Sequence, residues 1–146
     1  MIYLGVDPGL TGALAWLCGG EITVADMPVV AGEVDVDAVA RLLRNDPPGR
    51  AVVERVHSMP GQGVASSFKF GMSYGAILAV VVVAQIETHL VTPNVWKKHY
   101  RLTADKEQAR AMAIRLWPGC GLFSRKKDQG RAEAALLAKY CMEVIT

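Results

Sequence analysis

The stretch Met1-Ile-Tyr-Leu-Gly-Val-Asp7-Pro-Gly-Leu-Thr-Gly12 decides how the rest of the chain is interpreted. Its apolar run predicts a buried strand over residues 2–6, and the Pro-Gly turn after Asp7 predicts an abrupt end to that strand. An aspartate at the end of a central strand is either a turn residue or a metal ligand held on a rigid element. The segment alone leaves both interpretations open, so partners elsewhere in the chain must decide.

The following residues predict an antiparallel meander. Residues 13–18 form a second apolar run, Gly19-Gly20 is a hairpin signal, and residues 21–27 alternate in the manner of a third strand. A connector is expected over residues 28–33. The first forty residues therefore predict three sequential strands, with the first strand on the inner side.

Helices and strands are predicted to alternate in the remainder of the chain. The valine-rich run near residue 80 also fits a strand, but Gly71 and Gly75 stand four residues apart and favour a helix that another helix can approach closely. The expected elements are a helix over 35–44, a strand over 51–56, a helix over 64–85, a strand over 87–91, a short helix after Thr92, a helix from about 103 to 117, a basic loop over 124–130 and a last helix over 131–144. This order, β-β-β-α-β-α-β-α-α, is that of an α/β protein of the ribonuclease H-like fold with a five-stranded mixed sheet flanked by helices.

The composition is that of an ordinary globular protein. The chain has 146 residues, of which 51% are hydrophobic and 21% charged, which suits a single domain with one core. Its cysteines, Cys18, Cys120 and Cys141, form no CxxC pair, so we expect them to be reduced and the protein to be intracellular. The N-terminus lacks a basic segment before its apolar run, so we expect no secretory signal.

The net charge of +2 is unevenly distributed. Residues 1–92 carry 5 Lys/Arg and 9 Asp/Glu, whereas residues 93–146 carry 11 Lys/Arg and 5 Asp/Glu. A basic second part joined to an acidic first part suggests a polyanionic partner such as nucleic acid. Lysine-rich solvated helix faces are the plainer alternative.

Two acids interrupt apolar strands. Glu54 lies within Ala-Val-Val-Glu-Arg-Val, where a carboxylate is costly to bury unless it is paired or bound to a metal. A pairing with Arg55 or another cation is the structural alternative. If Asp7 and Glu54 end adjacent parallel strands, their carboxylates repel each other, and a divalent cation resolves that repulsion. Oxygen ligands favour Mg²⁺ or Mn²⁺ over zinc.

Two further acids, Asp128 and Glu133, stand at the start of the last predicted helix. Five residues correspond to roughly 140° of rotation on a helix, so both can face one metal only if Asp128 lies in the preceding loop. The alternative is that both serve the positive end of the helix dipole.

Three ordered segments resemble the acidic motifs of RuvC-type Holliday junction resolvases, in particular the compact phage-type members. They are Asp7-Pro-Gly-Leu-Thr-Gly-Ala, Val-Val-Glu54-Arg-Val and Asp128-Gln-Gly-Arg-Ala-Glu133-Ala-Ala-Leu-Leu-Ala. The resemblance spans nearly the whole chain and implies one nuclease domain over residues 1–146. The family's last helix usually presents two ligands three residues apart, but the position three before Glu133 is Gly130, and Asp128 is expected to replace the missing ligand.

The resemblance implies a structure-selective endodeoxyribonuclease that resolves four-way and possibly other branched DNA junctions. The expected metal ligands are Asp7, Glu54, Asp128 and Glu133, holding Mg²⁺ (or Mn²⁺), with two ions per site. Paired hydrolysis of phosphodiester bonds would leave 5′-phosphates and 3′-hydroxyls. Lys97 and Lys106 are expected to stabilise charge on the scissile phosphate, and Lys106 begins a helix, where its charge opposes the dipole; a solvated lysine is the plainer alternative.

The same resemblance implies a set of DNA contacts and an assembly. His57 takes the place of an aromatic residue that helps to open the junction. The other expected DNA contacts are Lys97, Lys98, Lys106, Arg125, Lys126, Lys127 and Arg131. Because a four-way junction has two-fold symmetry, a homodimer is expected, with its interface on the helix over 64–85. The protein is expected in the cytoplasm of a bacterium or a phage-infected host, with no membrane partner.

Three other functions fit parts of the pattern. An actin-like phosphotransferase also has an Asp-x-Gly turn after its first strand, but it needs a second domain for which 146 residues leave no room. A nuclease of the same fold that processes structured RNA, such as pre-rRNA, and a non-catalytic nucleic-acid-binding protein both remain open.

Overall fold

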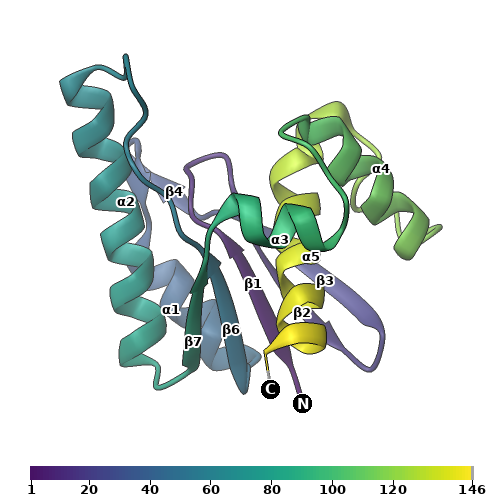
Figure 1. Cartoon of the computed structure of the whole chain (residues 1–146). Helices are drawn as coiled ribbons and strands as arrows, with labels where there is room; N and C mark the ends of the chain where they lie inside the picture. The colour runs from purple at the N-terminus through teal and green to yellow at the C-terminus, as the bar shows by residue number, and fades with distance from the viewer. Residues whose placement is uncertain (146) are drawn as a thin grey trace.

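The computed structural model describes residues 1–145 and shows a five-stranded mixed sheet with helices on both faces (Figure 1). Its strand order is β3-β2-β1-β6-β7. The strands are β1 (Tyr3–Asp7), β2 (Ala13–Cys18), β3 (Glu21–Asp26), β6 (Arg50–Glu54) and β7 (Glu87–Val91). β2 pairs antiparallel with β1 and β3, whereas β6 pairs parallel with β1 and β7. The predicted ribonuclease H-like sheet is therefore confirmed, with β1 at its centre.

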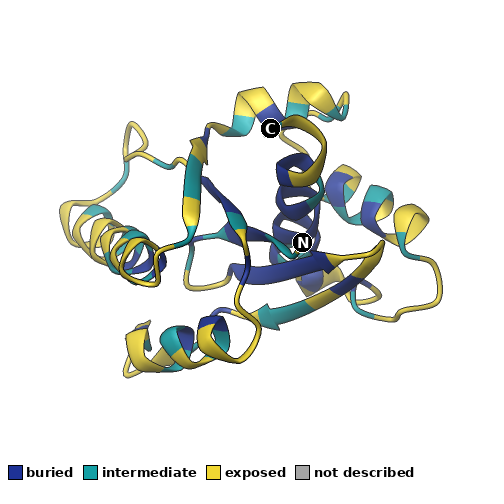
Figure 2. Ribbon diagram, turned by 90° about the horizontal axis from the view of Figure 1, so that it is seen from below, coloured by how far each residue is buried: buried dark blue, intermediate teal, exposed yellow. Residues whose placement is uncertain are grey.

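Side-chain alternation along the strands divides the core between the two faces. The helices are α1 (Val36–Asn45), α2 (Val64–Val83), α3 (Pro93–His99), α4 (Lys106–Leu116) and α5 (Gln129–Val144). On one face, Leu4, Val6 and Val53 pack with residues of α1 and α2. On the other face, the strands pack against α5, with α3 and α4 beside it. Figure 2 shows the buried centre of this arrangement, in which α5 and the middle strands are dark along most of their length.

Small residues bring α5 close to the sheet. Gly5 of β1 lies directly against the backbone of Ala134, so that a Cβ at position 5 would overlap the Ala134 carbonyl oxygen. Ala132, Ala135 and Ala138 of α5 are fully buried in the same layer. This close approach fixes the height of α5 above β1, and thereby the position of every side chain that α5 directs toward the end of that strand.

Several element boundaries differ by a few residues from those predicted, and two short elements were not predicted. The expected connector over 28–33 contains a small hairpin, β4 (Val29–Val30) and β5 (Glu33–Val34), whose turn residues Ala31 and Gly32 both have positive φ. β6 ends at Glu54 rather than at Val56. A short 3₁₀ helix, Lys126–Asp128, lies in the expected basic loop, and α5 follows it directly.

The valine-rich segment is helical, as predicted, but much of α2 is exposed. Ser73, Ile77 and Val81 are its buried residues, while Val64, Phe68 and Val83 are largely exposed. By length and composition alone, α2 is long and apolar enough to cross a membrane, and it is the one such helix among the described residues. It packs here along α1 and beside β7 and β5.

Candidate active site

Asp7 and Glu54 end two neighbouring parallel strands. Val6 of β1 is paired with Val53 of β6, so the next residue of each strand brings the two acids side by side at the same edge of the sheet. Alternation turns Leu4, Val6, Ala51 and Val53 toward α1 and α2, which leaves both acids on the face covered by α5. The predicted proximity of the two carboxylates is thus present in the structure.

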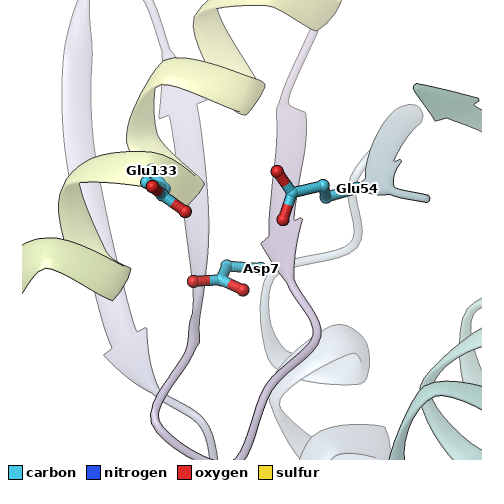
Figure 3. A group of neighbouring side chains, drawn as sticks. All are labelled: Asp7, Glu54 and Glu133. Atoms are coloured by element: carbon cyan, nitrogen blue, oxygen red, sulfur yellow. The ribbon is translucent and has the colours of Figure 1, made fainter. Parts of the chain in front are cut away.

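Glu133 approaches the same point from α5. One ligand oxygen from each of Asp7, Glu54 and Glu133 lies within 4.8 Å of the other two. Figure 3 shows the three side chains directed into one space, Asp7 and Glu54 from strand ends and Glu133 from the helix above them. An all-oxygen set of this size is the donor chemistry that Mg²⁺ and Mn²⁺ prefer.

The electrostatics of the group favour a bound cation. Burial, together with the nearby charges of Glu133 and Glu54, raises the pKa of Asp7 to about 7. Burial likewise raises the pKa of Glu54, although a hydrogen bond from Trp96 opposes that rise. Asp7 and Glu54 therefore resist full ionisation in the absence of a cation, and a divalent metal would remove that resistance.

A buried oxygen supports the same conclusion. Glu133 is only 2% exposed, and its Oε1 accepts no hydrogen bond among the described residues. Lys97 Nζ lies 3.3 Å from that oxygen and Lys106 Nζ lies 3.9 Å from Oε2, as ion pairs. A buried carboxylate that has two other carboxylates within 4.8 Å, and one oxygen without a hydrogen bond, fits a metal ligand.

Lys97 and Lys106 reach the site from different helices. The Lys97 side chain is 14% exposed, which places it inside the site rather than on an outer DNA-facing surface. Lys106 is the first residue of α4, as expected, and its side chain is 54% exposed. Both ammonium groups therefore lie beside Glu133, that of Lys97 half-buried and that of Lys106 more accessible to a substrate.

Asp128 does not join the acidic group. It is 2% exposed and accepts hydrogen bonds from the backbone N–H and the guanidinium of Arg125, with Arg131 Nε 3.7 Å away. Burial raises the pKa of Asp128, but the hydrogen bonds and charge of Arg125 outweigh it and hold that pKa below its usual value. The expectation that Asp128 supplies a ligand from the loop is therefore corrected: its carboxylate caps the 3₁₀ turn that leads into α5.

Gly130 occupies the helical position that would face the metal one turn before Glu133. A Cβ at residue 130 would lie 3.4 Å from Asp7 Oδ2, but also 2.5 Å from the carbonyl oxygen of Thr11 and 3.1 Å from Cα of Gly12. The loop after β1 fills the space that a side chain would need. Among the described residues, the carboxylates of Asp7, Glu54 and Glu133 therefore form the group that could hold a metal ion.

The remaining basic residues fall into two groups. Arg125 and Arg131 are engaged by acids: Arg125 by Asp128, and Arg131 by a two-point contact with Asp26. These contacts lie at the start of α5, and the expected DNA contacts of Arg125 and Arg131 stay predictions. The other group is exposed: His57, Lys98, Lys126 and Lys127. Lys98 also lines a pocket with Lys97 and Arg101, close to the acidic group.

Sequence reasoning missed two residues of the site and its surroundings. Trp96, fully buried, donates a hydrogen bond from Nε1 to Glu54 Oε1 at 3.0 Å. Asp26, at the end of β3, holds Arg131 from 105 residues away in the chain. The signal for Trp96 was present, since Val-Trp-Lys places a large apolar side chain beside an expected active-site lysine, but nothing in the pattern connects Asp26 with Arg131.

The chain is similar to known proteins over most of its length. A crossover junction endodeoxyribonuclease RuvC from Zymomonas mobilis is 32% identical over 138 residues, covering 84% of this chain and 81% of that protein. The RuvC of Solidesulfovibrio magneticus is 29% identical over 155 residues, covering 96% of this chain and 88% of that protein. No protein-family model matches.

Two solved structures share the fold. The structure of T. thermophilus RuvC in complex with Holliday junction substrate has a TM-score of 0.64 and 20% identity, covering 94% of this chain and 90% of that chain. A second Thermus thermophilus RuvC structure has a TM-score of 0.61 and 20% identity, covering 97% and 96% of the two chains. With the relative at 32% identity and the acidic motifs in the same fold, the chain belongs to the RuvC family of crossover junction endodeoxyribonucleases.

Proposed function

We propose that this protein is a metal-dependent endonuclease that resolves four-way DNA junctions by paired hydrolysis of phosphodiester bonds. The observation that carries the proposal is the convergence of Asp7, Glu54 and Glu133 within 4.8 Å of one another in a chain of the RuvC family. The names of its relatives specify crossover junctions and DNA, and one solved neighbour holds a Holliday junction. Other branched DNA substrates fall within the same proposal.

Mg²⁺ is the proposed ion, with Mn²⁺ able to replace it, and two ions per site are proposed. Support comes from the donor set, which consists of carboxylate oxygens with neither sulfur nor imidazole. The number of two ions follows from the resemblance to RuvC-type resolvases and from the two-metal chemistry of phosphodiester hydrolysis. Bound divalent ions would lower the pKa of an attacking water and stabilise the leaving 3′-oxygen.

The protein's own side chains would position the phosphate. Lys106 is half exposed beside Glu133, so its ammonium is available to a nonbridging phosphate oxygen as negative charge develops there. Lys97 is half-buried against Glu133 and contributes positive charge from within the site. Hydrolysis in this arrangement leaves a 5′-phosphate and a 3′-hydroxyl at each cut.

Exposed basic residues are proposed to hold the DNA backbone. Lys98 and Arg101 line a pocket that continues from Lys97, and Lys126 and Lys127 are exposed before α5. Contacts of this kind read the shape and charge of a junction rather than its base sequence, and they weaken as salt is added. His57, exposed in the segment after β6, is proposed to stack on DNA near the junction centre.

A homodimer through α2 is proposed as the active assembly. Val64, Phe68 and Val83 are 89%, 69% and 81% exposed along this helix, and Gly71 and Gly75 have open space where a Cβ would stand. An apolar helix with small residues four apart suits a second helix packed against it. A four-way junction has two-fold symmetry, so a C₂ dimer would present one site to each of two opposed strands.

Cleavage assays with matched substrates test the proposal. Wild-type protein with Mg²⁺ is expected to cut a four-way DNA junction into nicked duplexes and to leave linear duplex DNA intact. Asp7→Asn is expected to bind the junction without cutting it. Cleavage of a four-way RNA in preference to DNA would favour the structured-RNA nuclease instead, and equal activity of the Asp7→Asn variant would exclude catalysis by this site.

A further inference from the structure

We propose that Trp96 is a positioning residue that orients the Glu54 carboxylate for metal binding. The inference rests on the proposed function, since Glu54 is taken as a ligand there. Trp96 lies in α3, outside the three acidic segments, and its fully buried indole contacts the site through Glu54. Its role would be to hold a ligand in place through a single hydrogen bond.

The contact is buried on both sides. Trp96 Nε1 donates to Glu54 Oε1 at 3.0 Å, and the two residues are 0% and 7% exposed. Water therefore does not compete for this bond, and the carboxylate cannot rotate without leaving an indole N–H unsatisfied. One Glu54 oxygen is fixed by the indole, which sets the plane of the carboxylate that faces Asp7 and Glu133.

The indole ring is itself immobilised by the elements that carry the ligands. Trp96 belongs to a buried cluster formed by residues of β6, β7, α4 and α5: Val52, Val91, Ala109, Leu136, Leu137, Tyr140 and Cys141. Glu54 ends β6, and Glu133 lies one turn before Leu136 and Leu137 in α5. A donor held by packing against both ligand-bearing elements is the arrangement that keeps a metal site in its productive geometry.

The chemistry of the donor suits this task. The indole N–H stabilises the ionised carboxylate without adding a positive charge that would repel a divalent cation. The next residue, Lys97, places its charge 3.3 Å from Glu133 instead, and its Nζ lies 5.3 Å from the centre of the Trp96 ring. Adjacent residues of α3 thus contact two different ligands, a neutral donor on Glu54 and a cation on Glu133.

The two other tryptophans provide internal controls. Trp16 Nε1 donates to the carbonyl oxygen of Asp46 at 3.0 Å, and Trp117 Nε1 donates to the carbonyl oxygen of Gly20 at 3.1 Å. All three indoles donate one hydrogen bond, but that of Trp96 goes to a proposed metal ligand. Replacement by phenylalanine removes the donor in each case and keeps an aromatic ring in the packing.

Isothermal titration with Mn²⁺ compares wild type, Trp96→Phe and Trp117→Phe. Trp96→Phe is expected to raise the Kd for Mn²⁺ on the order of tenfold, and to raise the Mg²⁺ concentration needed for half-maximal cleavage similarly, with kcat near wild type at saturating Mg²⁺. Trp117→Phe is expected to match wild type in both. A purely structural role of Trp96 would lower the melting temperature and leave the metal affinity of the folded fraction unchanged.

NMR of the wild-type protein keeps the inference falsifiable if Trp96→Phe folds poorly. With ¹⁵N-labelled tryptophan, Mg²⁺ is expected to shift the indole N–H signal of Trp96 while those of Trp16 and Trp117 stay in place, and Glu54→Gln is expected to abolish that shift. Wild-type metal binding with an unmoved Trp96 signal, or with equal Mn²⁺ affinity in Trp96→Phe, would overturn the inference alone. Absence of metal binding in wild type would overturn it together with the proposed function.

Discussion

Gly130 of α5 lies so close to Thr11 that a Cβ on residue 130 would stand 2.5 Å from the Thr11 carbonyl oxygen. The loop after β1 and the first turn of α5 are therefore in backbone contact at the edge of the acidic group. This contact explains why the helix offers one carboxylate, that of Glu133, rather than two ligands three residues apart. It also makes position 130 intolerant of any side chain.

Gly130→Ala is accordingly expected to destabilise the protein by about 1–3 kcal/mol, because backbone must move to admit the methyl group. Urea denaturation measures this loss. Gly75→Ala in α2 is the matched control, since a Cβ there meets nothing within 4 Å; both variants are made in the Phe68→Asp background, so that the proposed α2 interface does not contribute. It is expected to be neutral or stabilising by up to about 1 kcal/mol through helix propensity. Equal stability of the two variants at one protein concentration would contradict the observed contact.

Substitutions of Asp128 and Glu133 are expected to change different properties, the first the stability and the second the metal affinity. Asp128→Asn removes the charge that Arg125 pairs with, and is expected to cost about 1–2 kcal/mol of unfolding free energy, since half of the Arg125 side chain is exposed. Its Mn²⁺ affinity should match wild type. Glu133→Gln is expected to weaken Mn²⁺ binding by roughly tenfold or more. Thermal unfolding and calorimetric titration provide the two readouts, and a large affinity loss in Asp128→Asn would restore it as a ligand.

The raised pKa of Asp7 predicts a pH-dependent response to metal. Because that pKa rises from 3.8 to about 7 in the folded protein, its contribution to metal-free stability is fully present below pH 3.8 and is lost as pH rises through about 7. A divalent ion needs the ionised carboxylate, so below this range it must displace a proton. The rise in melting temperature on adding Mg²⁺ is therefore expected to be larger near pH 8 than near pH 6. A metal-induced rise that is the same at both values would contradict the assignment; Asp7→Asn should abolish the difference.

The exposed apolar face of α2 predicts a dimer that a single introduced carboxylate dissociates. Phe68→Asp places a carboxylate on a side chain that is 69% exposed in the single chain, and it is expected to convert a dimer into a folded monomer. Val30→Asp, at a 58% exposed position on β4, is the control and should remain dimeric. Sedimentation velocity distinguishes the species. A wild-type monomer at high protein concentration would count against the α2 interface.

The sequence predicted much of the fold because its signals are local. Apolar runs ended by Asp7-Pro-Gly and by Gly19-Gly20 mark strand ends, and the order of strands and helices then selects the sheet. The hairpin at Ala31-Gly32 escaped notice because its strands are two residues long and carry little pattern.

The proposed ligands that end buried strands could be predicted from the sequence. The acids at the start of α5 could not be told apart, because their rotation about the helix axis determines which of them faces the site. Asp7 and Glu54 follow from parallel pairing, which fixes which residues are neighbours. The 3₁₀ turn and the ion pair with Arg125 hold Asp128 away from the acidic group, and neither contact has a signal in the sequence. The position of Trp96 beside Lys97 hinted at a place near the site, but its hydrogen bond to Glu54 spans 42 residues and could not be predicted from the sequence.

Cleavage of a mobile four-way DNA junction by wild type and Glu54→Gln, with and without Mg²⁺, tests the central claim most directly. Glu54 is 7% exposed and the glutamine variant keeps its shape and can still accept the hydrogen bond from Trp96, so folding should be preserved. The account predicts paired nicks by wild type that require Mg²⁺, and junction binding without cleavage by Glu54→Gln. Failure of folded wild-type protein to cut the junction with any divalent metal, or undiminished cutting by Glu54→Gln, would contradict it.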